Sequence, residues 1–394
     1  MTMPTAAAAR IQDVPTIESL SADQIATIKA IPPHVDDEVR AISDSRPLSF
    51  FLGEDQFALE QERVFRRLPV PMALSALLPN PGDVLAVDSY GPDVLLTRAK
   101  DGVVRAFLNA CTHKGASLVE TGEPGRAPRL VCPYHAWTFS LEGQLIGVPR
   151  QEGFAGLCRE ERNLAELPCR EIGGVIWVGL TRDSEPDFSD IEGQLMIDFE
   201  ALRIPEMHAY GRRRFELKAN WKLVLEPFLE PYHVKRLHAN SVAPLFADVA
   251  GLSHRLGRNI RQISGKVQFS PDKVGGGENI HKSITHAYTA FPNLVVVTSP
   301  YYISMMILAP QAIDRTIVDY VMLTRGAPDN PKAEELFAKS YAMILDVFGN
   351  EDFKAAEKCH RGLVQGAMPD VIYCGLEEMI PLYYSILDAE TGAA

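Results

Sequence analysis

The 394-residue sequence lacks the features that mark several large classes of protein. It has no run approaching the roughly 18 consecutive apolar residues of a membrane-spanning helix. Its N-terminus shows neither the basic start nor the apolar stretch of a signal peptide. Lysine and arginine number 39 against 51 aspartate and glutamate, and the resulting net charge of −12 argues against a main role in binding nucleic acid or anionic lipid. We therefore expect a cytoplasmic protein with no membrane or nucleic-acid partner.

Cysteine is also scarce. Six cysteines are too few for a disulfide scaffold, so a spacing pattern among them points to metal or redox chemistry. The sequence also lacks a Gly-x-Gly-x-x-Gly motif after a strand and a plant-type ferredoxin cysteine run. We expect the chain to depend on a separate protein for any electrons that come from a nicotinamide.

What the sequence does contain divides it into three parts. Residues 1–47 are Ala-rich and low in aromatics, and we interpret them as an N-terminal arm. Residues 48–180 are dominated by short apolar runs separated by Gly-Pro, Asp-Gly and Glu-Gly turns, which predicts a small all-β domain. Residues 181–394 combine helical periodicity at 216–240 and 332–349 with long apolar strands. This pattern predicts an α+β domain in which helices pack on an antiparallel sheet.

Four potential metal ligands occur as two mixed pairs, Cys111-Thr-His113 and Cys132-Pro-Tyr-His135. Each pair puts a thiolate and an imidazole on a turn beside a predicted strand. Structural zinc sites usually draw their ligands as Cys-x-x-Cys or His-x₃-His pairs. Mixed pairs instead suit a two-iron cluster in which both cysteines bind one iron and both histidines bind the other. A zinc knuckle and four unrelated core residues are the alternative interpretations.

The two pairs resemble the Rieske [2Fe-2S] signature, in which Cys-x-His is followed after a spacer by Cys-x-x-His. The resemblance implies that Cys111, His113, Cys132 and His135 bind a [2Fe-2S] cluster. Respiratory Rieske proteins join their two loops by a disulfide, whereas the corresponding places here hold Ala116 and Tyr134. We therefore expect electrons from a ferredoxin-like donor rather than from a quinol.

A second constellation lies in the segment EPFLEPYHVKRLH. Glu226, Glu230 and His233 are four and three residues apart, so on a continuous helix they would share one face, and His238 follows five residues later. Two histidines near a carboxylate fit a 2-His-1-carboxylate iron site, which leaves one face of the metal open for dioxygen and substrate. The alternative is an ordinary amphipathic helix.

The order of these motifs, with Asn220-Trp221-Lys222 between them, is similar to that of the Rieske non-haem iron oxygenases. The similarity is to their terminal oxygenase (alpha) subunits, as in aromatic ring-hydroxylating dioxygenases. It implies a helix-grip (START-like) fold for the third part, with a curved antiparallel sheet around a long helix. It also implies that His233 and His238 bind a mononuclear Fe(II).

The third iron ligand of the family is an aspartate on a late helix. The resemblance carries this role to Asp352, and Glu351, Asp346 and Glu357 are the alternative carboxylate ligands. A helix N-cap is the alternative role for Asp352, because aspartate is a favoured cap residue.

Glu230 departs from the aspartate that most family members have at its position. In the family this residue bridges a Rieske histidine of one subunit and an iron histidine of the next. The bridge here would run from His135 through Glu230 to His233. Glutamate keeps the charge and the acceptor atoms but is one methylene longer. A similar glutamate occurs in members that act on carnitine-like quaternary ammonium compounds.

The resemblance further implies partners. Oxidation with O₂ requires more electrons than one iron holds stably, and the cluster would store the additional one. Electrons from NAD(P)H would arrive through a reductase, a ferredoxin or both. A closed homotrimer would bring one subunit's cluster near the next subunit's iron. An additional small beta subunit is compatible with the chain length.

For the substrate we expect an aromatic or other apolar small molecule, which the enzyme hydroxylates or oxidatively demethylates. We predict Phe291, Tyr301 and Met305 as pocket residues, because strands at 284–308 are rich in aromatic and soft apolar side chains. One alternative is a monooxygenase of a small quaternary ammonium compound, which the same aromatic surface would hold by cation–π contacts. Another is a non-catalytic Rieske electron carrier, which the three candidate iron ligands argue against.

Overall fold

The computed structural model describes residues 14–32, 41–247, 251–270 and 274–392. The chain forms two compact units. The first, here called the β unit, is Phe65–Phe188. The second, the α+β unit, combines Met1–Val64 with Ser189–Ala394. The sequence predicted divisions after residues 47 and 180, and residues 1–13 and 33–40 of the predicted arm lie outside the described residues.

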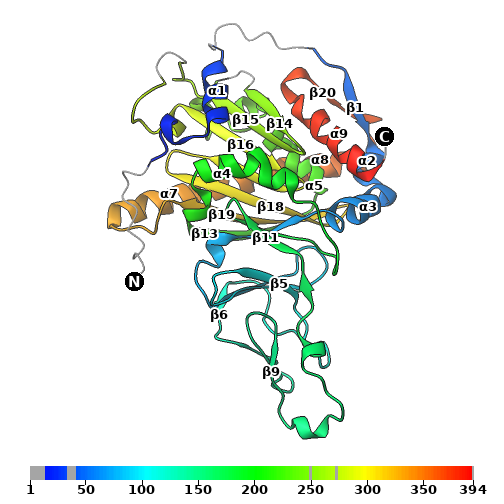
Figure 1. Cartoon of the computed structure of the whole chain (residues 1–394). Coiled ribbons are helices and arrows are strands. Elements are labelled where there is room, and N and C mark those ends of the chain that lie inside the picture. The colour runs from blue at the N-terminus through cyan, green and yellow to red at the C-terminus, as the bar shows by residue number, and fades with distance from the viewer. Residues whose placement is uncertain (1–13, 33–40, 248–250, 271–273, 393–394) are drawn as a thin grey trace. The chain divides into compact units, whose positions relative to one another are not determined.

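The β unit contains three antiparallel sheets (Figure 1). The first has the order β10 (Glu166–Leu167), β5 (Val104–Leu108), β4 (Val94–Arg98), β3 (Asp83–Val87) and β6 (Gly125–Arg126). The second has the order β11 (Cys169–Ile172), β12 (Val175–Val178) and β2 (Val70–Leu74). The third consists of β7 (Leu130–Val131), β8 (Thr138–Phe139) and β9 (Leu145–Gly147). The short strands and the turns between them confirm the all-β prediction for this part of the sequence.

Gly143 occupies the predicted Glu142-Gly143 turn between β8 and β9. Its φ is +86°, in the region where glycine avoids the strain that other residues incur. A Cβ at this position would lie 2.4 Å from a ring carbon of Phe107. Glycine is therefore required here both by the backbone conformation and by the close approach of the aromatic ring.

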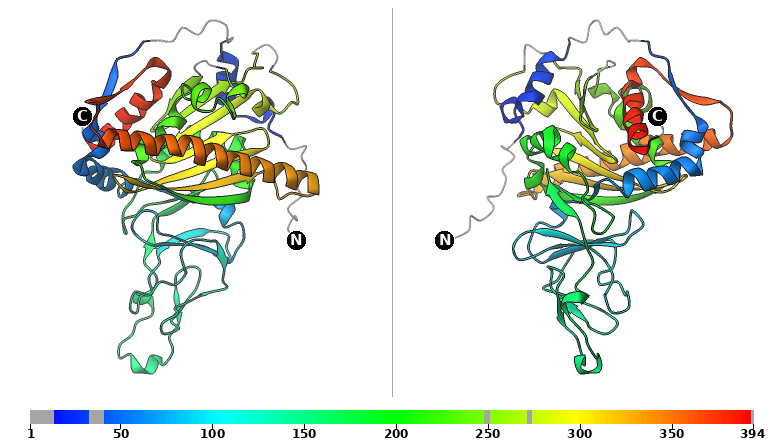
Figure 2. Two further views of the ribbon diagram at one scale, coloured as in Figure 1. Left: turned by 180° about the vertical axis from the view of Figure 1, so that it is seen from behind. Right: turned by 45° about the vertical axis from the view of Figure 1, so that its right-hand side comes forward.

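The α+β unit is built on a seven-stranded antiparallel sheet. Its strand order is β13 (His208–Leu217), β19 (Arg315–Thr324), β18 (Tyr302–Ala312), β17 (Leu294–Thr298), β16 (Ile284–Ala290), β15 (Asn259–Gly265) and β14 (Leu252–Leu256). A long helix crosses this sheet (Figure 2). It consists of α7 (Pro331–Val347), a π-helical turn (Phe348–Asp352) and α8 (Phe353–Val364). This arrangement agrees with the predicted antiparallel sheet and long helix.

Helices cover both faces of the large sheet. On one face, Tyr320 of β19 packs against Tyr341 of α7, with ring centroids 6.1 Å apart. On the other, Tyr288 of β16 packs against Phe199 of α4 (Met196–Ala201) at 5.4 Å. The strand register places Tyr288 and Tyr320 on opposite faces, because side chains alternate along each strand. We refer below to the α7 face and the α4 face.

Two short helices, α2 (Leu48–Leu52) and α3 (Glu54–Glu60), belong to the α+β unit. Glu60 and Lys222 form a buried ion pair with an N–O distance of 2.5 Å, and the Trp221 indole N–H donates to the other Glu60 oxygen at 2.8 Å. The Asn220 amide donates to the Phe51 carbonyl at 2.8 Å. Breaking a buried pair of this kind costs roughly 3–5 kcal/mol. The Asn-Trp-Lys motif therefore holds residues before 65 in this unit, which is the physical reason for the different boundary.

The helical periodicity at 216–240 does not correspond to one continuous helix. The segment contains α5 (Trp221–Leu225), a 3₁₀ turn (Glu226–Leu229) and α6 (Val234–Leu237). Glu230 is extended, with φ −148° and ψ 147°. The cause is Pro231, since a residue that precedes proline is disfavoured in the α region. Glu226, Glu230 and His233 therefore do not share one helical face.

The remaining helices and strands complete the α+β unit. They are α1 (Ala22–Ala30), the two-stranded sheet of β1 (Asp44–Pro47) and β20 (Asp370–Tyr373), and α9 (Met379–Thr391). Ser21 begins α1 with a capping box and also donates to Asp198 of α4 at 2.7 Å. This part of the predicted arm is therefore packed. Within the described part of the chain, no helix combines the length and apolar character needed to cross a membrane.

Candidate metal centres

Two loops of the same construction hold the cysteine–histidine pairs of the β unit. In the first, the Cys111 N–H donates to the Ala116 carbonyl at 2.9 Å, and the Gly115 N–H donates back to the Cys111 carbonyl at 2.8 Å. Gly115 has a φ of +80°. These bonds close the loop on itself and fix the backbone that carries Cys111 and His113. The His113 ring also stacks on Trp137 of the second loop, with centroids 4.8 Å apart.

The second loop repeats this pattern between β7 and β8. The Cys132 N–H donates to the Trp137 carbonyl at 2.8 Å, and the Ala136 N–H donates to the Cys132 carbonyl at 3.0 Å. Ala136 takes the place of Gly115 and also has positive φ, at 55°. This conformation is uncommon for a non-glycine residue, and such strain occurs often at functional sites.

The structure brings the four predicted cluster ligands together. Cys111 and Cys132 are buried in the core of the β unit, and the His113 and His135 ring centroids are 4.7 Å apart. Burial raises the pKa of the Cys111 thiol, the backbone N–H groups of His113 and Lys114 oppose this, and nearby Cys132 adds to it. His113 Nδ1 is buried without a hydrogen-bond partner among the described residues. A buried polar atom left in this way is costly unless a ligand satisfies it, so these residues fit a bound metal cluster.

A second group of ligands converges in the α+β unit. Asp352 Oδ1 lies 3.5 Å from His233 Nε2 and 3.4 Å from His238 Nε2. One ligand atom from each of these three residues lies within 4.8 Å of the others. Both Asp352 oxygens are buried and have no hydrogen-bond partner among the described residues. An isolated buried carboxylate is costly, whereas a bound cation would stabilise it, so the set fits a 2-His-1-carboxylate metal site.

The other ring nitrogen of each histidine is held by a glutamate. His233 Nδ1 donates to Glu230 Oε1 at 2.6 Å, and the His233 backbone N–H donates to Glu230 Oε2 at 2.9 Å. His238 Nδ1 donates to Glu351 Oε2 at 2.5 Å, which also accepts from Ser241 Oγ at 2.7 Å. These bonds fix the tautomer that leaves Nε2 free for a metal. The sequence predicted Glu351 only as a substitute ligand and missed Ser241.

Asp352 occupies the end of the π-helical turn between α7 and α8. Its backbone is helical, with φ −59° and ψ −53°, and its side chain makes no cap hydrogen bond, so the N-cap alternative is wrong. Asp346 instead accepts from the Asn350 amide at 2.5 Å, and Glu357 accepts from the Lys218 N–H at 2.9 Å. These two alternative carboxylates therefore have other partners.

The predicted pocket residues do not gather in one place. Phe291 packs against Tyr383 of α9 at 5.6 Å, and Tyr301 lines a cavity described below. Met305 lies on the α4 face, and its neighbour Met306 lies on the α7 face opposite Tyr320.

The sequence-based choice of pocket residues did not include two aromatic side chains that lie close to the histidine segment and Asp352. Phe228 lies two residues before Glu230, and Phe348 lies one helical turn before Asp352. Their ring centroids are 5.6 Å apart, and Phe348 also contacts Tyr320 at 5.9 Å. The spacing of four residues between Phe348 and Asp352 was the available signal, since such residues are neighbours on a helix.

Two family models match the chain. The Rieske [2Fe-2S] domain matches residues 69–167, and the ring hydroxylating alpha subunit (catalytic domain) matches residues 204–383. This chain belongs to the Rieske non-haem iron oxygenases. It is a terminal oxygenase subunit with a [2Fe-2S] cluster and a mononuclear iron as its cofactors. The match to a catalytic domain excludes the electron-carrier alternative.

Known relatives agree with this assignment. The carnitine monooxygenase oxygenase subunit of Escherichia coli (strain K12) is 27% identical over 80% of this chain and 83% of its own length. The anthranilate 1,2-dioxygenase large subunit of Burkholderia cepacia is 30% identical over 49% of this chain and 47% of its own length. The crystal structure of the quaternary ammonium Rieske monooxygenase CntA with L-carnitine matches with a TM-score of 0.73 and 21% identity. The match covers 91% of this chain and 99% of that chain. Oxygenases of this family oxidise small molecules with electrons supplied by a partner.

Proposed function

We propose that this oxygenase acts on a small quaternary ammonium compound. In this reaction O₂, two electrons and two protons hydroxylate a carbon attached to nitrogen and release water, after which the product separates into an amine and an aldehyde. The observation that carries the proposal is Glu230, a glutamate hydrogen-bonded to His233, at the position where most family members have aspartate. A similar glutamate occurs in members that act on such compounds, and the carnitine monooxygenase of Escherichia coli matches most of this chain.

Aromatic side chains near the histidine segment and Asp352 support this substrate class. Phe228, Phe348 and Tyr320 come from the 3₁₀ turn, the π-helical turn and β19. Phe228 and Tyr320 each contact Phe348. The faces of aromatic rings attract a quaternary ammonium group through cation–π interactions. The same rings would also hold an aromatic substrate. A hydroxylase of an aromatic acid is therefore the second candidate, which the anthranilate dioxygenase relative favours.

We also propose a role for each metal-binding residue. Cys111, His113, Cys132 and His135 would hold the [2Fe-2S] cluster, and His233, His238 and Asp352 would hold the iron. When bound, the iron activates dioxygen and the cluster supplies it with an electron. Glu230 and Glu351 would hold the Nδ1 protons of the two iron histidines, so that both rings keep their orientation and bind through Nε2.

The route of the electrons is part of this proposal. NAD(P)H would reduce the cluster through a reductase, a ferredoxin or both, and the protein would form a homotrimer, with or without a small beta subunit. His135 is exposed on its loop, as expected of a residue that contacts another protein. Electrons would then pass from His135 of one subunit through Glu230 to His233 of the next.

A single-turnover experiment tests the substrate class. The protein is purified anaerobically, loaded with Fe(II), reduced with dithionite and mixed with O₂ and one compound at a time. Carnitine and glycine betaine are the quaternary probes. 3,3-Dimethylbutanoate is a matched control, because it replaces the ammonium nitrogen of glycine betaine by carbon and removes the positive charge.

We expect an amine and an aldehyde from at least one quaternary probe and no product from its uncharged analogue. The variant His233→Ala should give no product from any of these compounds. A phenol or cis-diol from benzoate or anthranilate, without turnover of the quaternary probes, would show that the substrate proposal is wrong and would support the second candidate.

A further inference from the structure

Part of the α7 face is open to solvent in the middle of the large sheet. Ala287 of β16 and Val297 of β17 lie opposite each other, and both are partly exposed although their strands are central in the strand order. Ala287 lies on the α7 face because the next residue, Tyr288, lies on the α4 face. Gln262 of β15 pairs with Ala287, shares its face and is also partly exposed. We call Gln262, Ala287 and Val297 the accessible patch.

The accessible patch adjoins the candidate iron site. The Gln262 amide donates to the Leu229 carbonyl at 2.7 Å. Leu229 directly precedes Glu230, whose carboxylate holds His233. The strand that carries Ala287 also packs against the 3₁₀ turn that ends at Leu229. A small molecule on the accessible patch would therefore lie between the sheet and the segment that carries the iron histidines.

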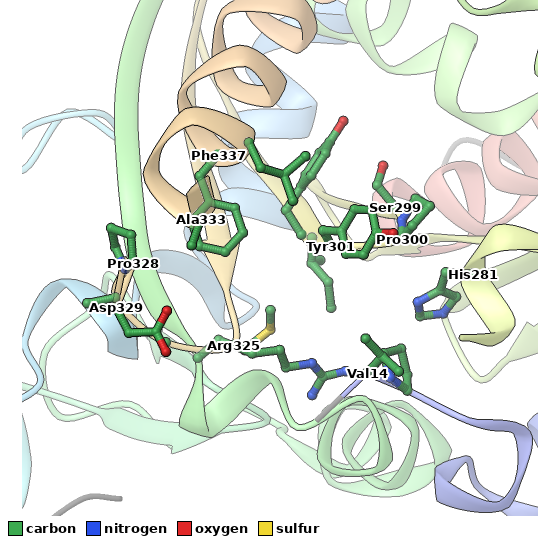
Figure 3. Close-up of a pocket in the computed structure, with 17 residues that line it drawn as sticks. Val14, His281, Ser299, Pro300, Tyr301, Arg325, Pro328, Asp329, Ala333 and Phe337 are labelled. Atoms are coloured by element: carbon green, nitrogen blue, oxygen red, sulfur yellow. The ribbon is translucent and has the colours of Figure 1, made fainter. Parts of the chain in front are cut away.

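The accessible patch is distinct from the cavity at the end of the sheet where β18 begins and β19 ends (Figure 3). The described lining of that cavity includes Tyr301, His281 and Arg325, but no residue of the accessible patch and none of the candidate iron ligands. Of these two places on the sheet, the accessible patch is therefore the one beside the iron site.

Gln262 is the one polar side chain of the accessible patch, and only part of its amide is used within the protein. The bond from Nε2 to the Leu229 carbonyl fixes the direction of the amide. Its Oε1 has no hydrogen-bond partner among the described residues. The free groups are thus an acceptor oxygen and the second N–H of Nε2. A hydroxyl group fits this pair because it both donates and accepts, whereas a carboxylate only accepts and would be repelled by Oε1.

We propose that Gln262 is a specificity-determining residue that binds a hydroxyl group of the substrate. This inference rests on the proposed function, since the accessible patch must hold the molecule that is oxidised at the iron. It narrows the substrate to a quaternary ammonium compound that carries a hydroxyl group. The ammonium group would lie against Phe228 and Phe348, and the hydroxyl group would lie at Gln262. The small side chains of Ala287 and Val297 would leave room for the rest of the molecule.

L-Carnitine and γ-butyrobetaine test this inference, because they differ in a single hydroxyl group. Binding of each compound to the full-length holoenzyme, loaded with Fe(II), is measured by isothermal titration without O₂. The test variant is Gln262→Met, which keeps the length of the side chain and removes both polar groups. The control is Gln268→Met, because the Gln268 amide also donates to a backbone carbonyl, that of Lys282 at 2.6 Å, but in an exposed position. We expect wild type and the control to bind L-carnitine about tenfold more tightly than γ-butyrobetaine, and Gln262→Met to bind the two within about twofold of each other.

A second variant covers the case in which Gln262→Met fails to fold. Ala287→Leu adds bulk to the accessible patch while leaving Gln262 in place, and it should weaken the binding of both compounds by about tenfold or more. Unchanged cluster absorption and thermal midpoint would show that each variant is folded. Three results would overturn the inference while leaving the proposed substrate class intact: equal binding of the two compounds by wild type, a preference that survives in Gln262→Met, or undiminished binding by Ala287→Leu.

Binding of neither compound by wild type would instead show that the proposed substrate class is wrong. 3-Hydroxybenzoate and benzoate, which also differ in one hydroxyl group, then repeat the comparison for the second candidate. A preference for 3-hydroxybenzoate that Gln262→Met removes would support the role of Gln262. The absence of such a preference would overturn it.

Discussion

Replacing Glu226 with glutamine should make the stability of the α+β unit less sensitive to pH. Glu226 Oε1 accepts hydrogen bonds from the Tyr373 hydroxyl at 3.0 Å and the Tyr384 hydroxyl at 2.6 Å. These tyrosines belong to β20 and α9, so the carboxyl joins the 3₁₀ turn before Glu230 to two other elements. Burial raises the pKa of Glu226 from 4.5 to about 7; the two tyrosines oppose this rise, and Glu377 and Glu230 add to it.

The sign of the effect follows from the raised pKa. The folded protein holds the proton more tightly than the unfolded chain does. The stabilising contribution is therefore fully present below pH 4.5 and is lost as the pH rises through about 7. A rise from 4.5 to about 7 corresponds to roughly 3 kcal/mol. Because the Glu226 residue keeps some solvent exposure, screening reduces the expected effect to about 2 kcal/mol.

Glutamine keeps the carbonyl that accepts from the tyrosines but cannot ionise. We therefore expect the stability of Glu226→Gln, measured relative to wild type, to rise by about 2 kcal/mol from pH 5 to pH 8. The free energy of unfolding of each holoenzyme is measured by urea unfolding at several pH values, followed by circular dichroism. Titrations common to both proteins cancel when the wild-type value is subtracted from that of the variant. Glu357→Gln is the matched control, because the Glu357 side chain accepts from the Lys218 backbone N–H in an exposed setting. Parallel curves for wild type and Glu226→Gln would refute the reasoning.

Three further predictions concern the metal centres. His233→Ala should lose the mononuclear iron and all turnover while the visible and EPR spectra of the cluster stay unchanged; retained activity would contradict the ligand assignment. Glu230→Gln should keep both metals but slow electron transfer from cluster to iron, and an unchanged single-turnover rate would remove Glu230 from the route. Glu351→Gln should weaken iron binding by about 10- to 100-fold, because the partner that orients His238 loses its charge. Titration with Fe(II) measures this, and wild-type affinity would show that Glu351 does not support the ligand.

The cluster ligands were predictable from the sequence because most of their geometry is local. Cys111 and His113 lie in one short loop closed by its own backbone hydrogen bonds, and Cys132 and His135 lie in another. Only the approach of the two loops depends on the fold of the β unit, and the resemblance to the Rieske signature supplied that information. The two iron histidines were predictable for the same reason, since they lie only five positions apart in the sequence.

The substrate side of the iron site was not predictable in this way. The sequence identified β18 as an apolar strand but did not indicate which alternate residues face α7. A shift of one residue exchanges the two faces, and the structure places Met306 rather than Met305 opposite Tyr320. The break at Glu230 had a local signal in Pro231, but the periodicity of the surrounding apolar residues favoured one continuous helix instead.

Asp352 shows most clearly what the tertiary structure adds. A regular α-helix turns by about 100° per residue, so one additional residue in a π-helical turn changes the direction of the side chains that follow it relative to those before it. Here the π-helical turn Phe348–Asp352 separates α7, which packs on Tyr320, from α8, which packs on Phe215. The turn lets the two halves of one helix satisfy different packing surfaces while Asp352 reaches the histidines. A π-helical turn lacks a distinctive residue pattern, so the sequence located this aspartate by resemblance, whereas the structure explains its position physically.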